Sequence, residues 1–345
     1  MTQSHTVNRR IVLAQRPKGE PDDGTLRLES GDLPVPGEGQ MLLRNEYLSL
    51  DPYMRGRMSD APSYAEPVAI GDVMVGGTVS QVVSSRVNGF AEGDWVVAFG
   101  GWQDYALSDG KGVIHLGKDP EHPSWSLGVL GMPGLTAWAG LTQIGQPKEG
   151  ETLVVAGASG PVGSTVGQVA KILGCRVVGI AGGGKKCSHV VDTLGFDACI
   201  DYKADGFPAA LEAAVPDGID IYFENVGGAV FDAVLPLLNP SARIPLCGLI
   251  SQYNATSLPD GPDRMNYLMG QILRPPLPGV RPSDDDLGGR RQNRVSRGGD
   301  LGSRRGARGL PGPAARRGVW QARCAPQRLI LHGNSPPPQH QRTHS

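Results

Sequence analysis

Short runs of alternating apolar and polar residues fill the first third of the chain, separated by turns rich in Gly, Pro and Asp. This pattern is typical of half-buried β-strands. It predicts strands at Arg10–Ala14, Gln40–Ser49, Gly77–Val83 and Asp94–Phe99. Helical periodicity is nearly absent here, so residues 1–125 are expected to form a barrel-like all-β domain.

From about Trp125 the pattern changes to apolar strands that alternate with helical segments. Such alternation indicates a parallel sheet with crossover helices on its faces. The predicted strands are Leu153–Ala156, Arg176–Ile180, Ala198–Asp201, Ile219–Glu224 and Arg243–Cys247. The predicted helices are Val162–Leu173, Ser188–Leu194 and Asp263–Leu273. Residues 126–273 are therefore expected to form a doubly wound domain, and the fold class is α/β.

The last part of the chain, residues 274–345, has a different composition. It contains 14 Arg and 4 Asp but no Lys, Glu or Phe, which gives a net charge of +10. The preceding residues carry 19 basic and 30 acidic side chains, a net charge of −11, so the chain as a whole has a charge of −1. No helical or strand period is recognisable in this basic segment, and we expect no regular structure there.

The cysteines and the apolar runs bear on the compartment. The chain has five Cys, an odd number, and no CxxC pair, which suits free thiols in a reducing environment. The N-terminus lacks a secretory pattern, and no apolar run has the length of a membrane helix. We expect a cytoplasmic protein with no membrane partner.

A glycine-rich motif marks a candidate cofactor site. A buried strand leads into Gly157-x-x-Gly160-x-x-Gly163 and directly on into an amphipathic helix. Glycines let the backbone approach a pyrophosphate, and a helix N-terminus presents free N–H groups to it. The strand–turn–helix context favours a dinucleotide site over the alternative, a tight turn that binds nothing.

The end of the next strand indicates which dinucleotide binds. Residues 181–186 read AGGGKK, with no carboxylate to bind a ribose hydroxyl and with Lys185 and Lys186 placed for a 2′-phosphate. This favours NADPH. The alternative is that both lysines only face solvent on the first turn of the next helix.

Five stretches then resemble a known family: YLSLDPYMRGRM (47–58), GMPGLTAWAGL (131–141), GASGPVGS (157–164), YFENVGG (222–228) and CGLISQYN (247–254). They are similar to the prostaglandin/alkenal reductase group of the zinc-independent medium-chain dehydrogenases/reductases, which includes bacterial NADPH-dependent curcumin reductases. The resemblance extends from about residue 8 to about residue 273. It implies a GroES-like N-terminal domain, a Rossmann domain, a homodimer, and reduction of the C=C bond of enones or enals by hydride from NADPH.

The resemblance also implies site residues. Those expected at the pyrophosphate are Gly157, Gly160, Pro161, Val162 and Gly163. Those expected at the 2′-phosphate end are Lys186 and Tyr202, and those at the nicotinamide half are Asn225, Cys247 and Gly248. Tyr253 and Tyr53 would line the substrate pocket. Tyr253 is the candidate donor to the developing oxyanion or the proton source; the alternative is that it only packs on substrate and water supplies the proton.

The sequence also bears on a metal site and on two alternative functions. No metal is expected, because His115 and His122 have no Cys near them in sequence and the family's zinc-ligand signature is absent. A quinone oxidoreductase would share this fold and cofactor. An inactive NADPH-binding remnant whose basic tail binds nucleic acid is a further alternative, although no nucleic-acid partner is expected.

The basic segment replaces family landmarks. Relatives continue after the helix ending near Leu273 with a strand beginning like Gln-Gly-Phe-Val and finish near Phe-Gly-Lys-Leu-Val. The codons of residues 278–281 and 319–323, read one base later, permit these two sequences in that order. We therefore hypothesise a frameshift, which would remove a sheet strand and the dimer contacts; the alternative is a genuine disordered tail.

Overall fold

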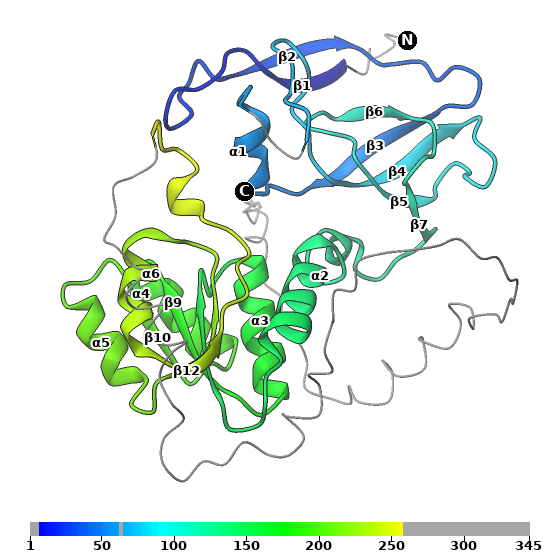
Figure 1. Cartoon of the computed structure of the whole chain (residues 1–345). Coiled ribbons are helices and arrows are strands. Elements are labelled where there is room, and N and C mark those ends of the chain that lie inside the picture. Colours follow the sequence, from blue (N-terminus) through cyan, green and yellow to red (C-terminus); the bar gives the residue numbers. More distant parts are fainter. Residues whose placement is uncertain (1–6, 62–64, 258–345) are drawn as a thin grey trace, which may run out of the picture. The chain divides into compact units, whose positions relative to one another are not determined.

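The computed structural model describes residues 7–61 and 65–257 (Figure 1). The helix predicted at Asp263–Leu273 and the whole segment 274–345, with the frameshift hypothesis, lie outside these described residues. The domain boundaries expected at residues 125 and 273 stay predictions. No helix within the described ranges is both long and apolar enough to cross a bilayer.

The first part of the chain is built from antiparallel strands, as predicted. β1 (Val7–Leu13) pairs with β2 (Leu26–Asp32), and a five-stranded sheet has the order β6-β3-β4-β5-β7. Its strands are β3 (Met41–Leu48), β4 (Thr78–Ser85), β5 (Trp95–Ala98), β6 (Tyr105–Ser108) and β7 (Ile114–Gly117). The pattern did not predict β2, β6 and β7, because β2 and β7 are largely exposed and β6 is only four residues long.

A short helix, α1 (Tyr53–Arg57), follows β3. Met54 lies within it and Met58 directly after it, and both are buried against Leu13 and Met74 in a small apolar cluster. Positions four residues apart lie on one side of a helix, so this pair fixes which way α1 faces. Tyr53 is partly buried and packs against the same cluster, so its orientation is fixed together with that of α1.

The second part of the chain forms a five-stranded parallel sheet in the order β10-β9-β8-β11-β12. The strands are β8 (Thr152–Ala156), β9 (Arg176–Ala181), β10 (Ala198–Asp201), β11 (Ile219–Phe223) and β12 (Leu238–Arg243). In order of sequence this is 3-2-1-4-5, which matches five of the six strands of a doubly wound fold, with β8 at the centre of the five. The predicted α/β class is therefore confirmed.

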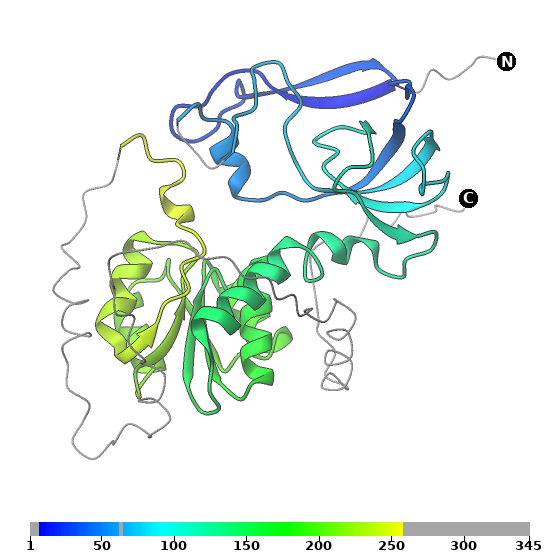
Figure 2. The ribbon, with the colours of Figure 1, turned by 45° about the vertical axis from the view of Figure 1, so that its right-hand side comes forward.

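Alternate residues of the central strands serve two different cores. Leu153, Val155 and Val177 pack with α2 (Met132–Ala139) and α3 (Pro161–Ile172) on one face of the sheet. Val154 and Val178 pack with α5 (Phe207–Ala214) and α6 (Gly228–Val234) on the other face (Figure 2). Burial on both faces explains why these strands are continuous apolar runs.

Two predicted elements of the parallel domain were placed wrongly. The strand predicted at Arg243–Cys247 is instead β12, Leu238–Arg243, and only Leu246 forms an isolated bridge with Glu224. Among residues 7–61 and 65–257, β12 pairs with β11; it contains Pro240 and Ser241, the latter with a φ of 65°, so it lacks an alternating apolar pattern.

The helix predicted at Ser188–Leu194 begins earlier, as α4 (Gly184–Ser188), and continues as a π-helical turn at His189–Thr193. The glycine run before it concealed the helix start, because glycine is a poor helix former. Cys199, in the strand predicted at Ala198–Asp201, is half-buried, since β10 is at the end of the sheet order.

Candidate functional site

The glycine motif forms the turn between β8 and α3. Gly157 has a φ of +66°, a conformation that favours glycine, and its carbonyl oxygen accepts a hydrogen bond from Gly160 N at 2.9 Å. Helix α3 begins directly after Gly160, with Pro161 in its first turn. A Cβ atom on Gly163 would lie 2.3 Å from the carbonyl oxygen of Gly157. The turn therefore packs so closely on the helix that only glycine fits at position 163.

The first turn of α3 has free donors. Pro161 has no N–H, no side chain caps the helix, and the N–H groups of Val162 and Gly163 have no hydrogen-bond partner among the described residues. Such groups, together with the positive end of the helix dipole, bind phosphate oxygens. The absence of a Cβ at Gly160 and Gly163 lets the turn pack closely against the start of the helix. These residues fit the pyrophosphate of a dinucleotide.

A second glycine turn follows β9. Gly183 has a φ of +96°, and α4 carries Lys185 and Lys186, both exposed. Neither lysine forms an ion pair with any residue that the structure describes. Two unpaired ammonium groups at the carboxyl end of a parallel strand fit a phosphate monoester.

The loop after β10 closes the same end of the sheet. Tyr202 N donates to Ala181 O at 3.1 Å, and the Tyr202 ring lies so near the backbone of Gly182 that a Cβ there would be 2.9 Å away. The Asp201 carboxylate accepts from Gly183 N at 2.8 Å and from Lys203 N at 2.9 Å. These backbone hydrogen bonds lower the pKa of Asp201. Asp201 thus fixes the turn that bears the lysines, a role the sequence did not predict.

The end of β11 carries two polar residues with different tasks. Asn225 Nδ2 donates to Ala156 O at 2.8 Å, which ties the end of β11 to the end of β8. Glu224 is fully buried, and one of its carboxylate oxygens accepts from Val226 N and from Gly227 N, the latter at 2.9 Å. Its other oxygen accepts from the Tyr222 hydroxyl at 3.0 Å. Glu224 therefore holds the turn that presents Asn225.

The segment 247–253 is attached to this turn by its backbone. Cys247 N donates to Glu224 O at 2.9 Å, and Ser251 N donates to Val226 O at 3.0 Å. Cys247 is exposed, although partial burial of its thiol raises its pKa. The Tyr253 hydroxyl lies beside Gly248, where a Cβ would be 3.1 Å from it. Gly248 and the Tyr253 hydroxyl therefore lie side by side within the segment 247–253.

Tyr53 lies in the antiparallel part of the chain, on α1. It lines a cavity of about 580 Å³ together with Ser49, Asp51 and Arg57 and with apolar residues such as Ile114. This volume is within the range of small-molecule sites. The predicted assignment of Tyr53 to a substrate pocket is thus compatible with its position.

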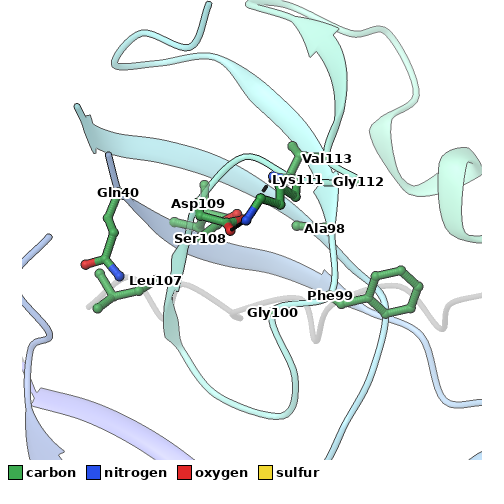
Figure 3. A pocket seen from close by; sticks show the side chains of 11 residues that line it. Gln40, Ala98, Phe99, Gly100, Leu107, Ser108, Asp109, Lys111, Gly112 and Val113 are labelled. Atoms are coloured by element: carbon green, nitrogen blue, oxygen red, sulfur yellow. Dashed lines mark hydrogen bonds and ion pairs between the residues drawn. The ribbon is translucent and has the colours of Figure 1, made fainter. Parts of the chain in front are cut away.

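A second cavity, of about 370 Å³, lies beside β3 and β6 and is lined by Gln40, Leu107 and Asp109, among others (Figure 3). Its charged residues neutralise each other, because Lys111 Nζ lies 2.9 Å from the Asp109 carboxylate. The Phe99 ring is 84% exposed and points away from the other labelled side chains in Figure 3. None of the predicted site residues lines this cavity.

The predicted cofactor residues thus gather at the carboxyl ends of parallel strands. The glycine turn follows β8, Lys186 and Tyr202 follow β9 and β10, and Asn225 follows β11. Ligands of doubly wound sheets bind at this edge. With an antiparallel β part before it in the chain, the arrangement is that of a nicotinamide-dependent dehydrogenase or reductase.

Comparison with known proteins identifies the family. A family described as "N-terminal domain of oxidoreductase" matches residues 9–116, and one described as "Zinc-binding dehydrogenase" matches residues 161–269. The chain is 64% identical over 274 residues to the NADPH-dependent curcumin reductase of Escherichia coli strain K12, covering 79% of each chain. It is 43% identical over 250 residues to prostaglandin reductase 1 of Mus musculus, covering 71% of this chain and 74% of the mouse protein.

A solved structure agrees with these matches. The crystal structure of CurA in complex with NADPH from Vibrio vulnificus has 65% sequence identity and a TM-score of 0.73, and the match covers 77% of this chain and 79% of that one. The chain belongs to the medium-chain dehydrogenase/reductase superfamily, in its prostaglandin/alkenal reductase group. The resemblance predicted from the five motifs is confirmed, and NADPH agrees with the cofactor of these relatives.

One of the matching families is described as zinc-binding, so the fit of a metal must be tested. Across residues 7–61 and 65–257, no three His, Cys, Asp or Glu side chains come together in a way that could hold an ion. His115 is bound to Asp94 at 2.9 Å, and His122 stacks on Trp125. The described residues do not fit a zinc site.

Proposed function

We propose that this protein reduces the C=C bond of α,β-unsaturated ketones or aldehydes with NADPH. The observation that carries the proposal is the glycine turn with two free backbone donors, in a chain that shares 64% identity with an NADPH-dependent curcumin reductase. NADPH, when bound, supplies a hydride to the β-carbon of the substrate. What the chain contributes is binding, orientation and electrostatic stabilisation.

The pyrophosphate is assigned to the backbone of the β8–α3 turn, residues 157–163. Lys186 and Tyr202 are assigned to the 2′-phosphate end, because the ammonium group is unpaired and the ring closes the loop beside it. Asn225, Cys247 and Gly248 are assigned to the nicotinamide half, since they share one hydrogen-bonded turn after β11. A dinucleotide extended along the carboxyl edge of the sheet would contact these groups in this order.

Tyr253 is the proposed acid. Addition of hydride at the β-carbon leaves negative charge on the substrate oxygen, which a hydrogen-bond donor stabilises. The Tyr253 hydroxyl lies beside Gly248, in the turn assigned to the nicotinamide half, and its side chain is 38% exposed. It is therefore accessible to donate a hydrogen bond to the oxygen or a proton to the α-carbon. Tyr53 is assigned to the wall of the substrate pocket.

The test is NADPH consumption with a straight-chain methyl enone, with the saturated ketone identified as product. The Tyr253→Phe variant is expected to lose about 100-fold in kcat with little change in KM for NADPH. The matched control is Tyr105→Phe on β6, which is expected to behave like the wild type. Turnover of quinones but not of enones by a protein that binds NADPH would assign it as a quinone oxidoreductase instead.

The same assay applied to two chains tests the frameshift. One is the chain as it stands, and the other has its codons after residue 273 read in the alternative frame. Activity only in the second version would support both the reductase function and the frameshift. Equal activity of the two versions would count against the frameshift.

A further inference from the structure

A third lysine lies beside the turn that bears Lys185 and Lys186. Lys203 belongs to the loop after β10, and the elements α4, β9 and β10 contact one another (Figure 1). Its side chain folds back over the end of β9, because a Cβ atom built on Gly182 would lie 3.1 Å from Lys203 Cε. Lys203 therefore reaches the glycine turn from a different element than the two lysines of α4.

The backbone around Lys203 is held in place by hydrogen bonds. A single carboxylate oxygen, Asp201 Oδ1, accepts from Gly183 N at 2.8 Å and from Lys203 N at 2.9 Å, and thereby joins the glycine turn to the loop after β10. Lys203 Nζ lies 6.0 Å from the centroid of the Tyr202 ring, at the outer limit of a cation–π contact, so the ring stabilises the ammonium group only weakly. The fold of the loop thus sets the position of Lys203 and leaves its charge available.

The charges around the turn do not balance. Lys203 is exposed and forms no ion pair with any side chain of residues 7–61 and 65–257. The Asp201 carboxylate attracts it, yet a single carboxylate offsets only one of the three positive charges carried by Lys185, Lys186 and Lys203. Like charges around one turn repel one another, and a phosphate monoester, which carries nearly two negative charges at neutral pH, would relieve that repulsion.

We propose that Lys203 is a further specificity-determining residue for NADPH, which binds the 2′-phosphate from the β10 loop while Lys186 binds it from α4. The inference rests on the proposed function for the position of the cofactor, but it adds a residue that lies outside the five family motifs. An ammonium group acts as a compact point charge, so lysines on two elements can share one phosphate. NADH has a hydroxyl group at this position and gains nothing from either charge. Discrimination between the two cofactors thus depends on both elements and on Asp201, which joins them.

The primary test is binding, measured by isothermal titration calorimetry of the full chain with NADPH, NADH and adenosine 2′,5′-bisphosphate. The bisphosphate carries the 2′-phosphate without the nicotinamide, so it reports on this end of the site alone. Lys203→Met is expected to bind NADPH and the bisphosphate about 5- to 20-fold more weakly, and NADH as the wild type does. Lys203→Arg is expected to keep most of the affinity, because it keeps the charge. NADPH binding by Lys203→Met should also depend less steeply on salt, since one fewer cation attracts the phosphate.

The matched control is Lys148→Met. Lys148 is also exposed, but it precedes β8 and so lies at the amino edge of the parallel sheet, at the opposite end of β8 from the glycine turn. This variant should bind all the ligands like the wild type. A thermal melt shows whether each variant is folded, and Lys203→Gln takes the place of Lys203→Met if the latter does not fold. Wild-type affinity of the folded variant for NADPH, or equal losses for NADPH and NADH, would overturn the proposal, because Lys203 would then only pack on Tyr202.

Turnover then separates this inference from the proposed function. If enones are reduced and Lys203→Met raises the KM for NADPH without lowering kcat, the function and the inference both stand. If enones are reduced and that KM is unchanged, the function stands and the inference fails alone. If no enone is reduced but Lys203→Met still weakens binding of the bisphosphate, the function fails and the assignment of Lys203 stands.

Discussion

The buried carboxylate of Glu224 offers a sharp test of how the cofactor edge is held together. The Glu224→Leu substitution introduces an apolar side chain of similar size and removes both carboxylate oxygens. Two backbone donors, Val226 N and Gly227 N, and the Tyr222 hydroxyl would lose their acceptor. All three interactions lie in or beside the turn that presents Asn225 to the cofactor.

The expected magnitude follows from these three groups. Each donor left buried without an acceptor costs about 1–3 kcal/mol, and the Tyr222 side chain is fully buried. Glu224→Leu is therefore expected to lower the free energy of unfolding by about 3–9 kcal/mol, a large part of the roughly 5–15 kcal/mol typical of a domain. Glu224→Gln keeps an oxygen towards the two N–H groups, and its amide can donate to the Tyr222 oxygen. Its cost is expected to be about 1 kcal/mol.

The assay is urea unfolding of the three full-length chains, together with NADPH titration. The leucine variant should unfold at lower urea and bind NADPH more weakly, whereas the glutamine variant should resemble the wild type in both. Equal losses in the two variants would refute the reasoning, because the negative charge and not hydrogen bonding would then be the important property. A loss of less than about 1 kcal/mol in Glu224→Leu would show that the turn reorganises at little cost.

Three further outcomes are expected. Lys186→Met should weaken NADPH binding about 10- to 30-fold and leave NADH binding unchanged, because only NADPH carries the 2′-phosphate. Lys185→Met serves as the control and shows which of the two lysines contributes more to NADPH binding. Equal losses of affinity for NADPH and NADH in Lys186→Met would contradict the assignment. Gly163→Ala should abolish NADPH binding in a fluorescence titration, since its Cβ would lie 2.3 Å from Gly157 O; a wild-type Kd would contradict this. Burial and the neighbouring Glu224 carboxylate raise the pKa of Tyr222, so the folded protein keeps a proton that the unfolded chain loses above about pH 10. Stability to urea should therefore fall as the pH rises beyond about 10, and less steeply in Tyr222→Phe.

The sequence predicted the elements with a continuous or alternating apolar pattern, such as β3 and β8, and missed or misplaced those whose pattern is short, exposed or interrupted. β8 and β9 are continuous apolar runs because helices cover both sides of the sheet, and the predicted bounds agree with the observed ones to within a residue. β12 was predicted in the wrong place because Pro240 and the positive φ of Ser241 interrupt its apolar pattern. A strand interrupted by Pro lacks a regular apolar alternation, so its pattern carries less information.

The same distinction holds for the candidate site. The glycines of the site could be predicted from the sequence because each is needed for a local reason. Gly157 has a φ of +66°, which favours glycine, and the close packing at Gly163 leaves no room for a Cβ. Asp201 and Glu224 were not predicted, since their function is to accept backbone hydrogen bonds whose donors depend on the folded loop. A carboxylate two or three residues before a glycine turn, as in ENVGG at 224–228, is a signal that could have found Glu224.

The two halves of the proposed reaction depend on different parts of the chain. The cofactor side is built largely from backbone N–H groups and glycines, whose geometry is kept as long as the turns are kept. High identity to NADPH-dependent relatives therefore indicates the same cofactor. The substrate side depends on individual side chains around α1, such as Tyr53, which are not part of the parallel sheet. Relatives with the same cofactor can therefore differ in substrate through one or two residues. For this reason the substrate of this protein must be established from the side chains that line this cavity, and not from overall identity.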